Sequence, residues 1–411
     1  MGKGRWTVDR IIFHCDLNCF YASAELLDHP ELRHLPVAVC GDPESRHGII
    51  LAKNEPAKGF GVKTAETIWQ ARKKCPELVL LPAHHDKYRR LSRQVGEIYR
   101  EYTDLVEPFG IDESWLDLTG SLHLFGGDAA SLADRLRDRL RRELGLTISV
   151  GVSFNKVFAK LGSDYKKPDA TTVITRENFR RIVWPLPVSD LLYVGRAAEQ
   201  TFQRFGVKTI GDLAAFDRQA LFTLLGKHGV QLHDYACGLD RSPVSPAGQY
   251  APPKSVGNGF PVPRNLQGRE EIRGGITQLS DHVAARLRLC GLKCQGVSLA
   301  IRDPDFHDIS RQTRLDAPTY LGRELAQAAM ALADQCWSMD RPVRALTDTA
   351  IDLIPAEEAA AQLELWDAPR QHQRERRERL EQTMDTIRAK YGGRAIQPAS
   401  APRGTASTGH D

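Results

Sequence analysis

Residues 11–25, IIFHCDLNCFYASAE, contain the clearest structural signal in the chain. The apolar residues that lead to Asp16 predict a buried strand, and the residues from Cys19 onward have helical spacing. A carboxylate therefore stands where a strand gives way to a helix. A second stretch, GIDESWLDLTG (110–120), places Asp112 and Glu113 side by side near the tip of a predicted hairpin.

These three acids can share one site. Neighbouring residues of a regular strand point to opposite faces, so Asp112 and Glu113 converge only where the backbone turns, as Gly110 allows. If Asp16 meets them, the crowded negative charge raises at least one pKa and costs stability. Mg²⁺ relieves such repulsion, and two ions ~3.5–4 Å apart can activate a hydroxyl and stabilise a leaving pyrophosphate. The alternative is that the pair is a solvated turn and that Asp16 caps a helix.

Composition bounds the class of protein. The 411 residues allow two to four domains. Hydrophobic residues make up 41% and charged residues 26%, as in a soluble globular protein. No apolar run approaches the ~18–20 residues of a membrane span, and the apolar stretch at 11–13 is far too short for a signal-peptide core. We therefore expect a cytoplasmic protein with no membrane partner. The net charge of +4 is spread evenly and does not by itself indicate nucleic acid.

The eight cysteines predict neither disulfides nor zinc. Cys15 and Cys19 enclose three residues, as do Cys290 and Cys294, whereas zinc pairs typically enclose two. We expect the thiols to be reduced, as in a cytosolic protein.

Strand and helix patterns change along the chain. They predict an α+β domain with an insertion at roughly 22–80, then short helices over roughly 186–242. A proline-rich linker over 242–253 precedes a module of strands and helices at 254–355. A charged helical stretch at 370–391 leads into a Pro/Ser/Gly-rich end.

A basic segment is a further candidate site. In SFNKVFAKLGSDYKKP (153–168), a helix start follows a strand, and Lys156, Lys160, Lys166 and Lys167 could meet phosphate oxygens. Lysines on a helix are, however, usually only a solvated face.

Together these segments resemble the Y family of DNA polymerases, the translesion enzymes, and most closely its DinB, or DNA polymerase IV, type. The likeness runs in order over roughly residues 10–355. The matching segments are HCDLNCFYASAE (14–25), AKNEPAKGFGVKTAE (52–66), GIDESWLDLTG (110–120), ISVGVSFNKVFAKLGSDYKKP (148–168), KTIGDLAAF (208–216), ACGLDRSPV (236–244) and KSVGNGF (254–260).

The resemblance implies a multidomain α+β right-hand polymerase with an additional α/β little finger. The implied domains are a palm (1–30 and 80–178), fingers (31–79), a thumb (179–243), a little finger (253–356) and a C-terminal tail (357–411).

The resemblance also implies roles for the acids. Asp16, Asp112 and Glu113 would hold two Mg²⁺ ions, and the carbonyl of Leu17 would add a ligand. Tyr21 would be the steric gate, whose ring leaves no room for a 2′-hydroxyl, the group that distinguishes RNA precursors from DNA precursors.

Three further residues are implied to bind the nucleotide, namely Phe20, Lys58 and Lys167. Lys58 stands where members often have arginine, so it keeps the charge but loses the bidentate fork. Two departures bear on this contact: Glu55 stands where many members have a tyrosine that touches the triphosphate, and Asn18 where many have aspartate. An acid near a triphosphate is unfavourable unless it points away.

Residues 188–206 and 220–233 resemble helix-hairpin-helix elements, whose backbone N–H groups grip phosphates without reading sequence. Tyr193 takes the place of the usual first glycine, and Gly195 is kept. A small packed helical domain is the plain alternative.

The tail contains a segment that resembles the peptide with which bacterial polymerases dock on the sliding (beta) clamp. The expected contacts are Gln362, Leu363, Leu365 and Trp366. An exposed Leu-Leu-Trp cluster in a charged tail is otherwise hard to explain, although it could end a surface helix.

The sequence thus predicts a monomeric, low-fidelity DNA polymerase without a proofreading exonuclease, which extends primer–template DNA with dNTPs and Mg²⁺ past damaged bases. One alternative is a non-catalytic scaffold that binds DNA and the clamp, which Glu55 and Asn18 keep open. The other is a palm-fold nucleotide cyclase, which has no use for a thumb, a little finger or a clamp peptide.

Overall fold

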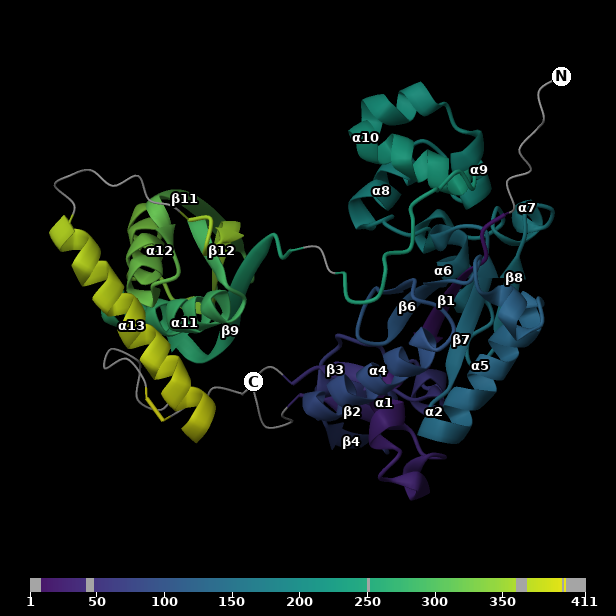
Figure 1. Cartoon of the computed structure of the whole chain (residues 1–411), viewed down its shortest axis with the longest axis horizontal. Helices are drawn as coiled ribbons and strands as arrows, with labels where there is room; N and C mark the ends of the chain where they lie inside the picture. Colours follow the sequence, from purple (N-terminus) through teal and green to yellow (C-terminus); the bar gives the residue numbers. More distant parts are fainter. Residues whose placement is uncertain (1–8, 42–47, 250–251, 360–367, 394, 397–411) are drawn as a thin grey trace. The chain divides into compact units, whose positions relative to one another are not determined.

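The computed structural model describes residues 9–41, 48–249, 252–359, 368–393 and 395–396. The chain divides into two compact units, residues 1–249 and 250–411 (Figure 1). In the described parts of the chain, no helix is long and apolar enough to cross a membrane.

A five-stranded sheet with the order β5-β6-β1-β7-β8 lies at the centre of the first unit (Figure 1). Its strands are β1 (Ile12–Leu17), β5 (Val106–Pro108), β6 (Glu113–Asp117), β7 (Ile148–Ser153) and β8 (Thr171–Ile174). β1 runs antiparallel to both β6 and β7, and all six of its residues are buried. The buried strand that the sequence predicted before Asp16 is confirmed.

Helices cover both faces of this sheet. They are α4 (His85–Arg100), α5 (Ala129–Leu144) and α6 (Lys156–Tyr165). On one face, the leucines of α5 pack with Phe13 and Cys15 in a single buried cluster. On the other face, α6 contacts β1 through His14 and Asp16. The alternation of side chains along β1 thus separates a structural face from a polar one.

α6 lies unusually close to the sheet because of Gly151. A Cβ at this position would meet the carbonyl oxygen of Ala159 at 1.8 Å and the backbone nitrogen of Ser163 at 2.4 Å. Only glycine fits there. Its absent side chain sets the depth at which α6 presents its lysines to the end of β1.

A separate three-stranded sheet, with the order β3-β2-β4, follows α1 (Phe20–Glu25). Its strands are β2 (Val37–Cys40), β3 (Ile50–Lys53) and β4 (Val79–Pro82), with helices α2 (Glu55–Gly59) and α3 (Ile68–Lys74). The last part of the first unit is helical, with its own apolar cluster, and consists of α7 (Phe179–Ile182), α8 (Arg196–Arg204), α9 (Ile210–Ala215) and α10 (Arg218–Ala236).

The proline-rich segment after α10 differs from the linker that the sequence predicted. Val244 is buried in a cluster with Ile12 and Trp115. The backbone N–H of Ser245 donates to Glu107 at 2.8 Å, as expected of a buried backbone group that needs a partner. Val244 and Ser245 are therefore packed against the rest of the first unit, which composition alone did not reveal.

The second unit contains an antiparallel sheet with the order β11-β10-β12-β9. Its strands are β9 (Ser255–Leu266), β10 (Leu292–Arg302), β11 (Asp308–Thr319) and β12 (Val343–Pro355). The helices α11 (Arg269–Leu289) and α12 (Gly322–Cys336) share its apolar core. The sequence pattern predicts strands at 297–301 and 349–353, which fall in the two central strands β10 and β12, and helices at 272–289 and 322–335, which fall in α11 and α12; it does not predict β9 and β11.

A charged helix, α13 (Ala368–Tyr391), docks on α11 and α12 through ion pairs (Figure 1). The nearly buried guanidinium of Arg288 pairs with Glu381 and Asp385, and Arg388 pairs with Asp281 at 2.7 Å. The predicted clamp contacts, 362–366, lie outside the described residues.

Candidate active site

The three predicted acids meet at one end of the central sheet. Asp16 and Glu113 are register partners across β1 and β6. Asp112 lies in the turn just before β6, and its carbonyl accepts the backbone N–H of Leu17 at 3.0 Å. The structure therefore brings together residues that are about one hundred positions apart in the sequence.

Crowding of these acids changes their proton affinity. Burial raises the pKa of Asp16, and the negative charge of Glu113 adds to the rise. Burial and the same neighbouring charge also raise the pKa of Asp112. Carboxylate oxygens are the ligands that a hard divalent cation prefers, and a cation bound here would remove the repulsion that raises the pKa of these acids.

Two lysines partly neutralise the acids. The Nζ atom of Lys167 lies 2.6 Å from Asp16 Oδ2, and that of Lys160 lies 2.8 Å from Glu113 Oε2. Burial would raise the pKa of Glu113, but contacts with His14 and Lys160 outweigh it and lower that pKa. Lys156, by contrast, pairs with Glu107 at 2.6 Å.

The side chain of Tyr21 is held by aromatic packing. It stacks on Tyr88, with ring centroids 4.1 Å apart and an angle of 14°, and meets His85 edge-on at 5.7 Å. Tyr21 remains partly exposed, whereas Phe20 is buried in the core beside it. The orientation of the Tyr21 ring is therefore fixed by its neighbours.

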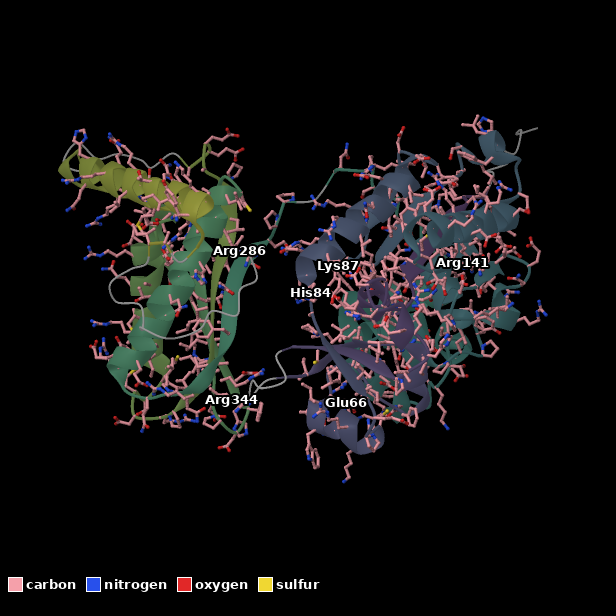
Figure 2. All side chains as sticks on the ribbon, turned by 90° about the horizontal axis from the view of Figure 1, so that it is seen from below. Glu66, His84, Lys87, Arg141, Arg286 and Arg344 are labelled. Atoms are coloured by element: carbon pink, nitrogen blue, oxygen red, sulfur yellow. The ribbon has the colours of Figure 1, made fainter. Side chains whose placement is uncertain are left out.

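A buried carboxylate anchors this aromatic group. Glu25 accepts a hydrogen bond from the Tyr88 hydroxyl at 2.5 Å. His84 and Lys87, labelled in Figure 2 at the start of α4, lie 3.1 and 3.6 Å from Glu25. These contacts tie α1 to α4 and hold the helix that carries Tyr21.

Glu55 and Lys58 form an ion pair rather than two independent groups. Their side chains are 2.6 Å apart and about half exposed, and Glu55 also accepts from the Cys19 thiol at 3.3 Å. Burial would raise the pKa of Glu55, but the contacts with Lys58 and Cys19 lower it. Part of the positive charge of Lys58 is thus neutralised where the sequence analysis expected it to meet a nucleotide.

Asn18 is a buried structural link between strands. Its Oδ1 accepts from the Ser149 hydroxyl at 2.9 Å, and its Nδ2 donates to Thr147 Oγ1 at 3.2 Å. The side chain is therefore engaged by β7 and the residue before it.

Tyr193, at the position of the usual glycine, has a φ of 69°. This left-handed region favours glycine, so Tyr193 has a backbone conformation that glycine adopts more easily.

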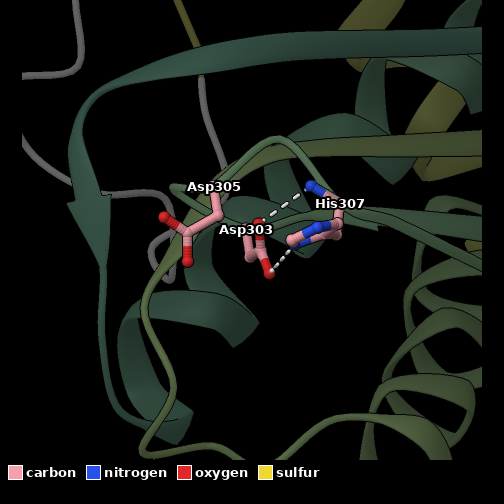
Figure 3. A group of neighbouring side chains, drawn as sticks. All are labelled: Asp303, Asp305 and His307. Carbon is pink, nitrogen blue, oxygen red and sulfur yellow. Dashed lines mark hydrogen bonds and ion pairs between the residues drawn. The ribbon is translucent and has the colours of Figure 1, made fainter.

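A group of side chains whose ligand atoms all lie within 4.8 Å of one another is found elsewhere, in the β10–β11 turn, and consists of Asp303, Asp305 and His307 (Figure 3). Asp303 accepts the backbone N–H of His307 at 2.9 Å and lies 3.3 Å from Arg341. Its carboxylate is thus already occupied as a turn-stabilising group, and the other two residues are exposed.

His14 is a residue at this site that was not predicted from the sequence. This fully buried side chain places Nε2 3.3 Å from Glu113 Oε2 and Nδ1 2.8 Å from Ser163 Oγ. Its spacing could have indicated this, because His14 stands two positions before Asp16 and side chains two apart on a strand share one face.

Comparison with known proteins identifies the family. Residues 15–164 match the impB/mucB/samB family, and residues 253–365 match the C-terminal domain of that family. The chain is 46% identical over 383 residues to DNA polymerase IV of Acetivibrio thermocellus, covering 93% of this chain and 95% of that protein. It is 38% identical over 388 residues to DNA polymerase IV 1 of Bacillus subtilis, covering 94% and 92%. The chain belongs to the Y family of DNA polymerases, in its DNA polymerase IV group.

A solved structure agrees with this family. A chimeric Y-family DNA polymerase matches with a TM-score of 0.73 at 19% identity, covering 84% of this chain and 99% of that one. At this identity the match shows the fold, and it supports the predicted multidomain right-hand architecture.

Proposed function

We propose that this Y-family chain is a DNA-directed DNA polymerase that carries out translesion synthesis on primer–template DNA with dNTPs. The observation that carries the proposal is the convergence of Asp16, Asp112 and Glu113 at the end of the central sheet, in a chain that spans almost the full length of relatives named DNA polymerase IV. Nothing in the described site favours the non-catalytic scaffold, because all three acids are present and adjacent.

Asp16, Asp112 and Glu113, with the carbonyl of Leu17, would hold two Mg²⁺ ions. When bound, such a pair of ions lowers the pKa of an attacking hydroxyl and stabilises a leaving pyrophosphate. The chain itself must hold its ligands in register, and the β1–β6 pairing does so for Asp16 and Glu113.

Cationic side chains would position the triphosphate. Lys167 reaches the carboxylate cluster from the end of α6 and is proposed to bind phosphate oxygens there. Lys58 is proposed to assist. Its pairing with Glu55 predicts a weaker attraction than a free arginine would give.

Tyr21 is proposed to exclude the ribose 2′-hydroxyl, with Phe20 packed behind it. The support is the stacking on Tyr88, which gives the gate a rigid backing.

The proposed domains are those that the family resemblance implies: a palm (1–30 and 80–178), fingers (31–79), a thumb (179–243) and a little finger (253–356). The thumb would grip phosphates through its hairpins. These domains include no proofreading exonuclease, so fidelity should be low. We further propose that the enzyme acts as a monomer in the cytoplasm and that residues 362–366 bind the sliding clamp, which would raise its local concentration on DNA.

The test is primer extension by wild type, Asp112→Ala and Asp305→Ala on undamaged and damaged templates. Asp112→Ala removes a proposed metal ligand and with it part of the charge stabilisation of the transition state. The rate of primer extension should therefore fall by ~100-fold or more. Asp305→Ala removes an exposed acid from the other acidic cluster and should extend like wild type. Normal extension by Asp112→Ala, or loss of extension by Asp305→Ala, would overturn the assignment of the active site.

A further inference from the structure

We propose that His14 is a positioning residue for Glu113, which it holds by one carboxylate oxygen so that the other oxygen is presented to the metal ions. This inference rests on the proposed polymerase function and deepens it. No step of the reaction is assigned to His14 itself.

The position of His14 is fixed before any ligand binds. It lies on the central strand β1 and has no exposed surface. Trp115 meets the imidazole edge-on, with ring centroids 5.3 Å apart. Ser163 on α6 holds Nδ1 at 2.8 Å. Gly151 allows α6 to come close enough for that contact.

The second ring nitrogen points at the site. Nε2 lies 3.3 Å from Glu113 Oε2, and this buried atom makes no hydrogen bond with any of the described residues. Buried polar atoms are almost always paired, so an atom in this state calls for an explanation. The neighbouring carboxylate provides one.

Proton placement on the ring follows from its two neighbours. A carboxylate can only accept a hydrogen bond, so the tautomer that suits the site carries its proton on Nε2. In that tautomer Nδ1 accepts, so the single proton of the Ser163 hydroxyl must point at Nδ1 rather than at the carbonyl of Lys160, which lies 2.8 Å away. A Ser163 hydroxyl that donates to Nδ1 would favour this tautomer, in the way that outer partners orient metal-site residues.

Both contacts on the carboxylate fall on the same oxygen. Lys160 approaches Oε2 at 2.8 Å from α6, and His14 approaches it from β1. Two neighbours on Oε2 restrict rotation of the carboxylate and leave Oε1 as its outward oxygen. Lys160 is on a long flexible side chain, whereas His14 is rigid, so His14 should determine the orientation.

The experiment measures Mn²⁺ binding by electron paramagnetic resonance to the full chain with primer–template DNA ended by a dideoxynucleotide and the next dNTP. His14→Gln places an amide N–H near the position of Nε2, whereas His14→Asn places its amide near Nδ1 and leaves Glu113 without the donor. We expect His14→Asn to weaken Mn²⁺ binding by ~10-fold or more, and His14→Gln to recover most of that loss.

Ser163→Ala is the second variant, since it leaves the imidazole in place but removes the group that selects its tautomer. Ser163→Ala should also weaken Mn²⁺ binding, but by less than His14→Asn does. Melting temperatures of all variants show whether they are folded. Equal Mn²⁺ affinity for wild type and a folded His14→Asn would overturn the inference, as would equal losses for the Asn and Gln variants.

Failure of the proposed function gives a different result. If the wild type does not bind Mn²⁺ in a way that Asp112→Ala weakens, the metal site itself is wrong. If that dependence holds and the His14 variants bind like wild type, only the role of His14 is wrong.

Discussion

At the scale of the residue, Tyr21 allows the sharpest prediction. Its ring is backed by Tyr88, so its removal should open space without unfolding the helix that carries it. Tyr21→Ala should incorporate ribonucleotides far more readily than wild type, because the 2′-hydroxyl no longer meets a ring. Tyr21→Phe keeps the ring and should retain sugar selection. The measurement is the ratio of kcat/KM for dNTP and rNTP, and an unchanged ratio in Tyr21→Ala would remove the gate assignment.

The raised pKa of Asp348 predicts how the stability of the protein depends on pH. It is buried in the second unit, accepts from Ser280 Oγ at 2.5 Å, and burial raises its pKa to about 6. The unfolded chain loses this proton at lower pH than the folded one, so this contribution to stability is present at acidic pH and is lost as pH rises from about 4 to about 6. The shift corresponds to ~3 kcal/mol.

The measurement for Asp348 is urea unfolding of wild type and Asp348→Asn across that pH range. The difference in free energy of unfolding between the two proteins should change by ~3 kcal/mol, because only the wild type titrates there. If the difference in free energy of unfolding between the two proteins does not change with pH, the pKa of Asp348 is not raised in the folded protein.

Some residues of the site were predictable and others were not. Asp16, Asp112 and Glu113 could be found because each stands at a predicted chain reversal. The pairing of Lys160 with Glu113 and of Lys167 with Asp16 could not, because it depends on the depth at which α6 packs on the sheet.

At the scale of the element, Gly151 determines how α6 meets the sheet. Gly151→Ala should destabilise the first unit by ~1–3 kcal/mol, because the added carbon meets backbone atoms that cannot rotate away. Gly96→Ala is the matched control. It lies within α4 with no atom closer than 3.9 Å to a new Cβ, so it should stabilise by ~0.5–1 kcal/mol. Chemical denaturation measures the change in free energy of unfolding for both variants. A Gly151→Ala variant as stable as wild type would contradict the close packing of α6 on the sheet.

The two edge strands of the second unit, β9 and β11, could not be predicted from the pattern of apolar and polar residues. β9 contains Gly257, Gly259, Pro261 and Pro263, which argue against a strand. It is nevertheless stable as the edge partner of β12, where a missing N–H is tolerated. β11 is the other edge and is largely polar, so it lacks the apolar run by which central strands are recognised.

At the scale of the whole molecule, the order of the motifs was enough to predict the fold class, because the family resemblance extended over most of the chain. How far the first unit extends into the proline-rich segment after α10 could not be predicted. Residues 242–249 look like a linker by composition, but Val244 and Ser245 contact the first unit. Such contacts join residues more than a hundred positions apart, and no local pattern records them.

The proposed polymerase activity requires three carboxylates, from two strands and a turn, to hold a pair of metal ions together. The most direct measurement is the number of Mn²⁺ ions bound in a stalled complex of enzyme, dideoxy-ended primer–template and dNTP. We expect two site-bound ions for wild type and fewer for Asp112→Ala at the same free Mn²⁺ concentration. An Asp112→Ala complex that binds both ions with wild-type affinity would contradict it.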